Sequence, residues 1–145
     1  MVDEHMAILK PVVVLAGWTM VMWLWMYATR LPAMTAAKVN PDDLVQGPKT
    51  SLDELLPPRV QWKAHNYNHL HEAPTVFYAV AMVLAMIGQG SGLNATIAWA
   101  YVILRVVHSL VQATINKVML RFALFALSTL CVIALVLHAA IALFH

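Results

Sequence analysis

Hydrophobic positions along the chain gather in long runs rather than in the alternating pattern of a half-buried strand. Three runs, at about residues 7–29, 93–116 and 119–144, are long enough for a helix to cross a bilayer, which needs about 20 residues. A fourth apolar run, 73–87, is too short to cross alone, so its helix must begin in the polar stretch before it. The pattern therefore predicts four spanning α-helices, the second covering about 60–87.

The connections between these runs differ in length. Residues 31–58 form the only long polar connection, and Pro32 favours ending the first helix just before it. Residues 88–92 read as a short turn, and a tight break near Asn116 separates the last two helices. Pro74 lies inside the second helix and is expected to kink it or to mark a cavity. One domain, 1–145, accounts for the whole chain.

Composition supports a membrane environment. Hydrophobic residues make up 61% of the chain and charged residues 11%, against about 45–50% and about 25% in typical soluble domains. The net charge of +2 comes without a basic tract, so the chain shows no sign of nucleic-acid binding. The single cysteine, Cys131, excludes an intrachain disulfide and a cysteine-rich metal site.

The distribution of Lys and Arg predicts the orientation. Basic residues occur in the first and third connections and their flanks, and the second connection has none. The positive-inside rule therefore makes the first and third connections cytoplasmic and puts both termini on the far side, in the periplasm or an organelle lumen. The compact length and short loops fit a bacterial inner membrane.

The third span carries a polar stripe within its apolar run. At 100° per residue, the side chains that share one helical face are Arg105, His108, Ser109, Gln112 and Asn116. Ionisable residues inside a span usually face a bundle interior or a cavity, so this stripe is a candidate functional face.

The second span carries a similar cluster near its cytoplasmic end. Glu72 shares a helical face with His65, Asn68 and His69, and Arg121 begins the fourth span at the same membrane level. A metal site is the less favoured interpretation, because the histidines lack the HExxH spacing and His71 points away from His69.

Together these side chains suit a small zwitterionic or anionic ligand. Arginine can bind a carboxylate through paired hydrogen bonds, and Glu72 can accept an ammonium group. An internal ion pair between Glu72 and Arg105 or Arg121, holding helices together, is the structural alternative.

Four motifs occur in order along the chain: Asn40-Pro41-Asp42-Asp43, Glu72 with Pro74 and Phe77, Arg105-Val106-Val107-His108-Ser109, and Asn116 with Arg121. In these motifs and their order the chain resembles the MAPEG family, the membrane-associated proteins in eicosanoid and glutathione metabolism. The resemblance covers nearly the whole chain.

The resemblance implies a left-handed four-helix bundle assembled as a homotrimer. It implies glutathione bound between subunits near the cytoplasmic side, and a lipophilic co-substrate that enters from the bilayer. Arg121 is then the candidate catalytic residue, because it would stabilise the glutathione thiolate. The candidate glutathione-binding residues are Glu72, His69, Asn68, Arg105, His108 and Gln112.

Two functions follow from the resemblance. The first is a membrane-bound glutathione transferase or glutathione-dependent peroxidase acting on lipophilic electrophiles. The second is a non-catalytic MAPEG-like subunit that binds lipid or joins a larger membrane complex. It is suggested by Gln112 and Phe125, which stand where some members carry tyrosines, and by His69, which stands where the family usually has asparagine.

Overall fold

The computed structural model describes residues 4–38, 56–72 and 74–145, and every regular element within these ranges is a helix. The Asn40–Asp43 motif lies outside the described residues. The helices are the short 3-10 helix η1 (Glu4–Met6), α1 (Leu9–Ala36), α4 (Pro58–Glu72), α5 (Pro74–Met86), α6 (Leu93–Thr114) and α7 (Val118–Phe144).

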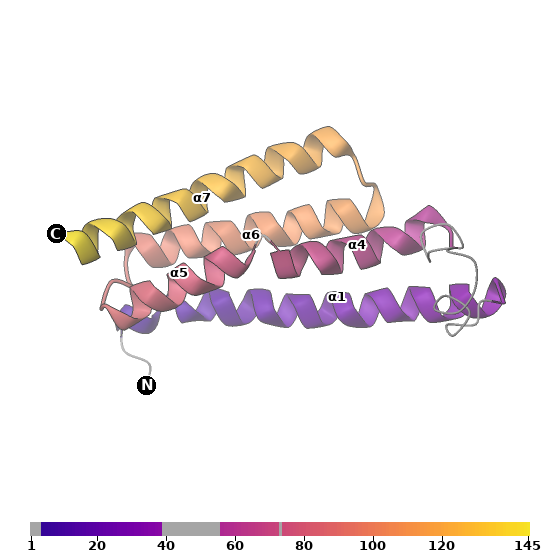
Figure 1. Ribbon diagram of the computed structural model, residues 1–145, viewed down its shortest axis with the longest axis horizontal. Coiled ribbons are helices and arrows are strands. Elements are labelled where there is room, and N and C mark those ends of the chain that lie inside the picture. Colours follow the sequence, from indigo (N-terminus) through magenta and orange to yellow (C-terminus); the bar gives the residue numbers. More distant parts are fainter. Residues whose placement is uncertain (1–3, 39–55, 73) are drawn as a thin grey trace.

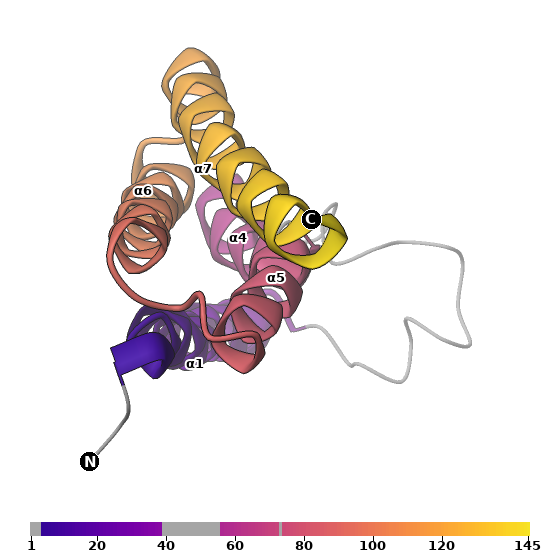
Figure 2. The same ribbon diagram turned by 90° about the vertical axis from the view of Figure 1, so that its left-hand side faces the viewer.

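The helices form an elongated bundle (Figure 1). α4 and α5 follow one another end to end and together make one rod, which lies beside α1 and α6. α7 packs against α6 and α5 (Figure 2). In Figure 1 the start of α1 and the end of α7 lie at one end of the bundle, and the turn between α6 and α7 lies toward the other. The sequence predicted an all-α bundle of membrane-spanning helices, and the structure confirms this fold.

The first long helix extends beyond the residue at which we expected it to end. α1 continues through Pro32 to Ala36, so the prediction that Pro32 ends the helix is wrong. Proline already has a helical φ, and its cost is the lost hydrogen bond to residue 28 and crowding of that carbonyl. Residues 28 and 32 are both exposed, so this crowding involves no neighbouring helix. The helix ends where Lys38 adopts a φ of 55°.

The second predicted span is divided at the expected place. α4 ends at Glu72 and α5 begins at Pro74, which confirms the predicted interruption. Pro74 has no N–H to donate to the carbonyl of Leu70. On the other side of the break, the Thr75 hydroxyl donates to the Glu72 carbonyl oxygen over 2.7 Å. The break therefore separates the polar α4 from the apolar α5 within the rod that they form together.

Apolar side chains fill the centre of the bundle and also cover its outside. Phe77 on α5 stacks on Tyr101 of α6 with ring centroids 4.3 Å apart, and both rings are buried. Among the described residues, three segments are long and apolar enough to cross a membrane: Glu4–Ala36, Leu93–Thr114 and Val118–Phe144. The apolar window of the last is only 17% buried within the chain, so most of its surface faces outward. Lipid is the environment that suits such a surface.

Candidate functional site

A cavity of about 260 Å³ lies between α4, α6 and α7. Its α7 residues, within 118–125, belong to the first two turns of that helix, which follow the turn between α6 and α7. Four of the seven residues selected from the sequence line it, together with three apolar side chains of α7. The lining consists of His69, Arg105, His108, Arg121, Val118, Phe122 and Phe125.

The polar stripe of α6 is buried as its spacing indicated. Arg105, His108, Ser109 and Gln112 are each at most 5% exposed. Arg105, His108 or Ser109, and Gln112 follow one another at steps of three or four residues, so they occupy one helical face. That face is directed into the bundle, while Ile103 and Val107 on other faces of α6 are exposed. Arg105 and His108 are the members of the stripe that line the cavity.

Arg105 pairs with no carboxylate of residues 4–38, 56–72 and 74–145. Its side chain is 1% exposed, and its Nε and Nη2 atoms have no hydrogen-bond partner within the described part of the chain. Taking a guanidinium group out of water without compensation costs several kcal/mol, and an anion with good geometry offsets part of this cost. Arg105 therefore gives the cavity a positive charge that an anionic ligand would compensate.

Arg121 is held at the start of α7 by the turn before it. Its Nη1 donates a hydrogen bond to Oδ1 of Asn116. Asn116 has a φ of 51°, a left-handed conformation that asparagine tolerates better than most residues. The Nε atom of Arg121 is buried and has no partner within the described ranges. The turn thus fixes one edge of the guanidinium group and leaves donors for a ligand.

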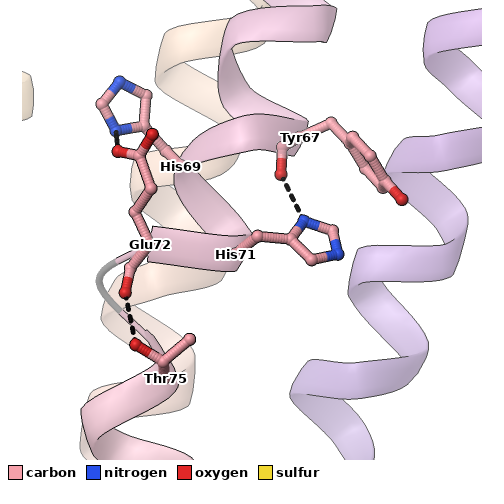
Figure 3. Close-up of polar contacts among 5 residues, drawn as sticks. All are labelled: Tyr67, His69, His71, Glu72 and Thr75. Carbon is pink, nitrogen blue, oxygen red and sulfur yellow. Dashed lines mark hydrogen bonds and ion pairs between the residues drawn. The ribbon is translucent and has the colours of Figure 1, made fainter.

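Glu72 pairs with a histidine rather than with an arginine. Its Oε2 lies 3.6 Å from Nδ1 of His69, and the two side chains are 70% and 45% exposed. Figure 3 shows both side chains on one side of α4, next to the break before Thr75. Neither Arg105 nor Arg121 forms an ion pair with Glu72 in the described structure. The alternative of an internal Glu–Arg pair is therefore not observed.

The remaining candidates lie away from the cavity. Asn68 is exposed and does not line it. Gln112 is buried one to two turns further along α6, and its Oε1 has no partner in the described chain. Neither residue contacts Arg121 through any hydrogen bond seen in the structure. Three of the seven candidates therefore do not line the cavity, and of these Glu72 pairs with a residue that does, His69.

Sequence reasoning missed two polar links that position α4. The Asn66 amide, fully buried, donates to the Ser109 hydroxyl on α6. Near the other end of α4, Arg30 Nη2 on α1 donates to Gln61 Oε1 over 3.2 Å. Asn66 and Gln61 lie on the inner face of α4, away from the charged face that drew attention in the sequence. Both residues share the buried side of α4 with Ala64 and Leu70, and their spacing from these apolar residues could have indicated that they are buried.

The histidines of α4 do not converge. The ring of His71 lies on the side of α4 that faces α1, opposite to His69 (Figure 3). Its Nδ1 donates to the Tyr67 carbonyl oxygen over 3.0 Å, because a carbonyl can only accept. Within residues 4–38, 56–72 and 74–145, no group of three His, Cys, Asp or Glu side chains is placed to hold a metal ion.

The fold and the cavity define a class of protein: a helical membrane bundle with a polar, arginine-rich cavity among its spanning helices. The sequence model of the MAPEG family matches residues 8–141, nearly the whole chain, and the protein therefore belongs to the MAPEG family. It is an integral membrane protein of the family associated with eicosanoid and glutathione metabolism. Searches of curated proteins and of solved structures found no match.

Proposed function

We propose that this protein binds glutathione in the cavity between α4, α6 and α7 and uses it as a transferase or peroxidase on lipophilic electrophiles. The observation that carries the proposal is that Arg105 and Arg121 line one cavity and that neither forms an ion pair with a carboxylate of the described residues. Glutathione carries two carboxylates, an ammonium group and a thiol. It therefore offers the anions that these arginines lack.

Arg121 is the proposed catalytic residue. A guanidinium group close to a thiol lowers the pKa of that thiol and favours the reactive thiolate. Arg121 is partly exposed at the rim of the cavity, and its neighbours there are the exposed rings of Phe122 and Phe125. An apolar electrophile dissolved in the bilayer would meet the thiolate at this boundary. Arg105, deeper in the bundle, suits a permanent anion such as a glutathione carboxylate.

We further propose a homotrimer in a bacterial inner membrane, with both termini periplasmic. α4 must complete the second span with α5, yet in the single chain its residues Asn68 and Glu72 are exposed. Polar side chains at membrane depth need protein or water around them. Neighbouring copies would cover this face. Crosslinking in native membranes is expected to give a trimer, and a ladder that stops at the dimer would contradict it.

Isothermal titration calorimetry of the detergent-solubilised protein with glutathione tests the binding. Arg121→Ala should weaken binding about 10-fold or more, because hydrogen bonds to charged groups contribute about 1.5–3 kcal/mol each. Arg59→Ala is the matched control, since Arg59 is exposed at the first turn of α4 and away from the cavity. No binding heat at millimolar glutathione, or equal losses in the two variants, would overturn the proposal.

A non-catalytic role is the second candidate, and one observation favours it. Phe125 lines the cavity where a phenol would supply a hydroxyl to the thiolate, so the described cavity wall contains no tyrosine. Activity assays with a lipophilic electrophile and with a lipid hydroperoxide separate the candidates. Turnover that depends on Arg121 supports the enzyme. Glutathione binding without turnover, together with a stoichiometric membrane partner that co-purifies, supports the second role.

A further inference from the structure

His69 and Glu72 form a pair at the edge of the cavity, and the proposed roles of the two arginines do not involve this pair. Nδ1 of His69 faces Oε2 of Glu72 at 3.6 Å, and the ring also lines the cavity with Arg105 and Arg121. The second ring nitrogen, Nε2, lies on the far side of the ring from Glu72 (Figure 3). The separation is longer than a hydrogen bond, as catalytic contacts often are before a ligand binds.

The pair has the arrangement that a general base requires. A carboxylate at Nδ1 favours the tautomer with its proton on Nδ1, which leaves Nε2 as the acceptor. The charged or titratable groups around the ring are Glu72 and His65 on its own helix, Arg105 and His108 on α6, and Arg121 on α7. Glu72 is the one carboxylate among them. It can therefore stabilise the imidazolium that forms when Nε2 accepts a proton.

We propose that His69 is a catalytic general base and acid, that Glu72 is its positioning residue, and that the electrophile is an α,β-unsaturated carbonyl compound. This inference rests on the proposed glutathione function and deepens it. It assigns to His69 a role in proton transfer beyond contact with glutathione.

The reaction balances without a further reagent. Nε2 of His69 takes the proton from the glutathione thiol, which leaves a thiolate beside Arg121 and an imidazolium beside Glu72. A sulfur electron pair forms a bond to the β-carbon of the electrophile. The carbon–carbon π pair moves to give an enolate, and the imidazolium returns its proton to that enolate. The product contains all atoms of both reactants, and the histidine is neutral again.

The thiol proton that His69 would hold is the reason for proposing an α,β-unsaturated carbonyl substrate. Conjugate addition consumes the thiol proton in the product, so a base that stores it beside the reacting atoms assists both halves of the reaction. Displacement of halide from an aryl chloride needs only the first half, because its proton is released to solvent. The rings of Phe122 and Phe125 supply an apolar surface for the chain of a lipophilic alkenal.

The test compares three variants of the full chain in detergent: His69→Asn, Glu72→Gln and His71→Asn. His71 is the matched control, because it lies on the same helix, is exposed and faces the opposite side (Figure 3). General acid–base catalysis contributes about 100-fold or more, so His69→Asn should lower kcat for a long-chain alkenal by about that factor. Glu72→Gln should lower it less, and His71→Asn should leave it near the wild-type value.

The same variants should separate addition from substitution. With chlorodinitrobenzene, His69→Asn should lose clearly less activity than with the alkenal, because no proton returns to that product. Equal losses with both electrophiles would overturn the assigned substrate class. An alkenal rate for His69→Asn within a factor of two of wild type would overturn the catalytic role of His69.

A binding experiment measures directly whether the thiol proton stays on the protein. Calorimetry in buffers of different ionisation enthalpy counts protons released on glutathione binding, and ultraviolet absorbance counts thiolate formed. The wild type should form thiolate without releasing protons, because His69 keeps them. His69→Asn should either lose the thiolate signal or release protons in equal amount. Thiolate with full proton release in the wild type would overturn this inference alone, whereas absence of glutathione binding would overturn the proposed function as well.

Discussion

The buried Asn66 amide on α4 hydrogen-bonds to the Ser109 hydroxyl on α6, and this contact sets the level at which the two helices meet. The helices run in opposite directions (Figure 1). His69, three residues after Asn66, and Arg105, four residues before Ser109, therefore lie on the same side of the contact. Both residues line the cavity. A single polar link thus positions the base of one helix against the guanidinium group of the other.

Ser109→Ala should destabilise the protein and weaken glutathione binding together. The substitution leaves the buried Asn66 amide without a partner, which costs about 1–3 kcal/mol in the free energy of unfolding. It also frees α4 to shift relative to Arg105. Thermal unfolding in detergent and calorimetry measure the two effects. Ser91→Ala, an exposed serine in the turn before α6, is the control; equal melting temperatures for the two variants would refute the prediction.

Arg105→Met should raise the stability of the ligand-free protein and lower its affinity for glutathione. Replacing buried charged groups by apolar residues of similar volume is often stabilising, by about 1–4 kcal/mol in studied cases. Arg105 is buried and pairs with no carboxylate among the described residues, so its removal relieves a cost that a bound anion would offset. The expected result is a higher melting temperature without glutathione and at least 10-fold weaker binding. A lower melting temperature would show that Arg105 already has a stabilising role.

Gly90→Ala should loosen the attachment of the N-terminal segment. A Cβ atom at Gly90 would lie 1.8 Å from the carbonyl oxygen of His5, and the Gly90 carbonyl accepts the N–H of Ile8 over 2.9 Å. Because backbone must move, we expect a loss of about 1–3 kcal/mol in the free energy of unfolding. Gly17→Ala in α1 meets open space and should instead stabilise by about 0.5–1 kcal/mol. Chemical unfolding in detergent measures the free energy of unfolding of both variants. An unchanged free energy for Gly90→Ala would contradict the close approach of Gly90 to His5.

Pro74→Ala should join α4 and α5 into a straighter helix. The new N–H can donate to the Leu70 carbonyl, which the proline leaves without its helical donor. Spin labels on the exposed residues Asn68 and Ala79, in a Cys131→Ser background, measure the change in distance across the break. Glutathione affinity should fall several-fold, since His69 is carried by α4. An unchanged label distance would show that packing, rather than Pro74, holds the break.

Parts of the site could be predicted because helical spacing is a strong constraint. His108 and Ser109 lie three and four residues after Arg105 in an apolar run, and such groups turn inward in a membrane. Helical spacing could not show that Asn68 lies outside the cavity, because the angle around a helix axis says nothing of where neighbouring helices lie. Nor could it show the burial of Asn66, which depends on α6. For Pro32, local preference indicated a helix end, but an exposed position in α1 tolerates the proline.

The sequence by itself determined that the chain is helical and membrane-embedded, because the length of its apolar runs and the cost of unpaired backbone in lipid leave few other solutions. It also determined which faces of α4 and α6 are polar. Only the tertiary structure decided which polar groups meet: Glu72 with His69 rather than with an arginine, Asn66 with Ser109, and Arg105 with Arg121 in one cavity. The reason is that such contacts depend on the axial level and rotation of packed helices, which periodicity within one helix cannot specify.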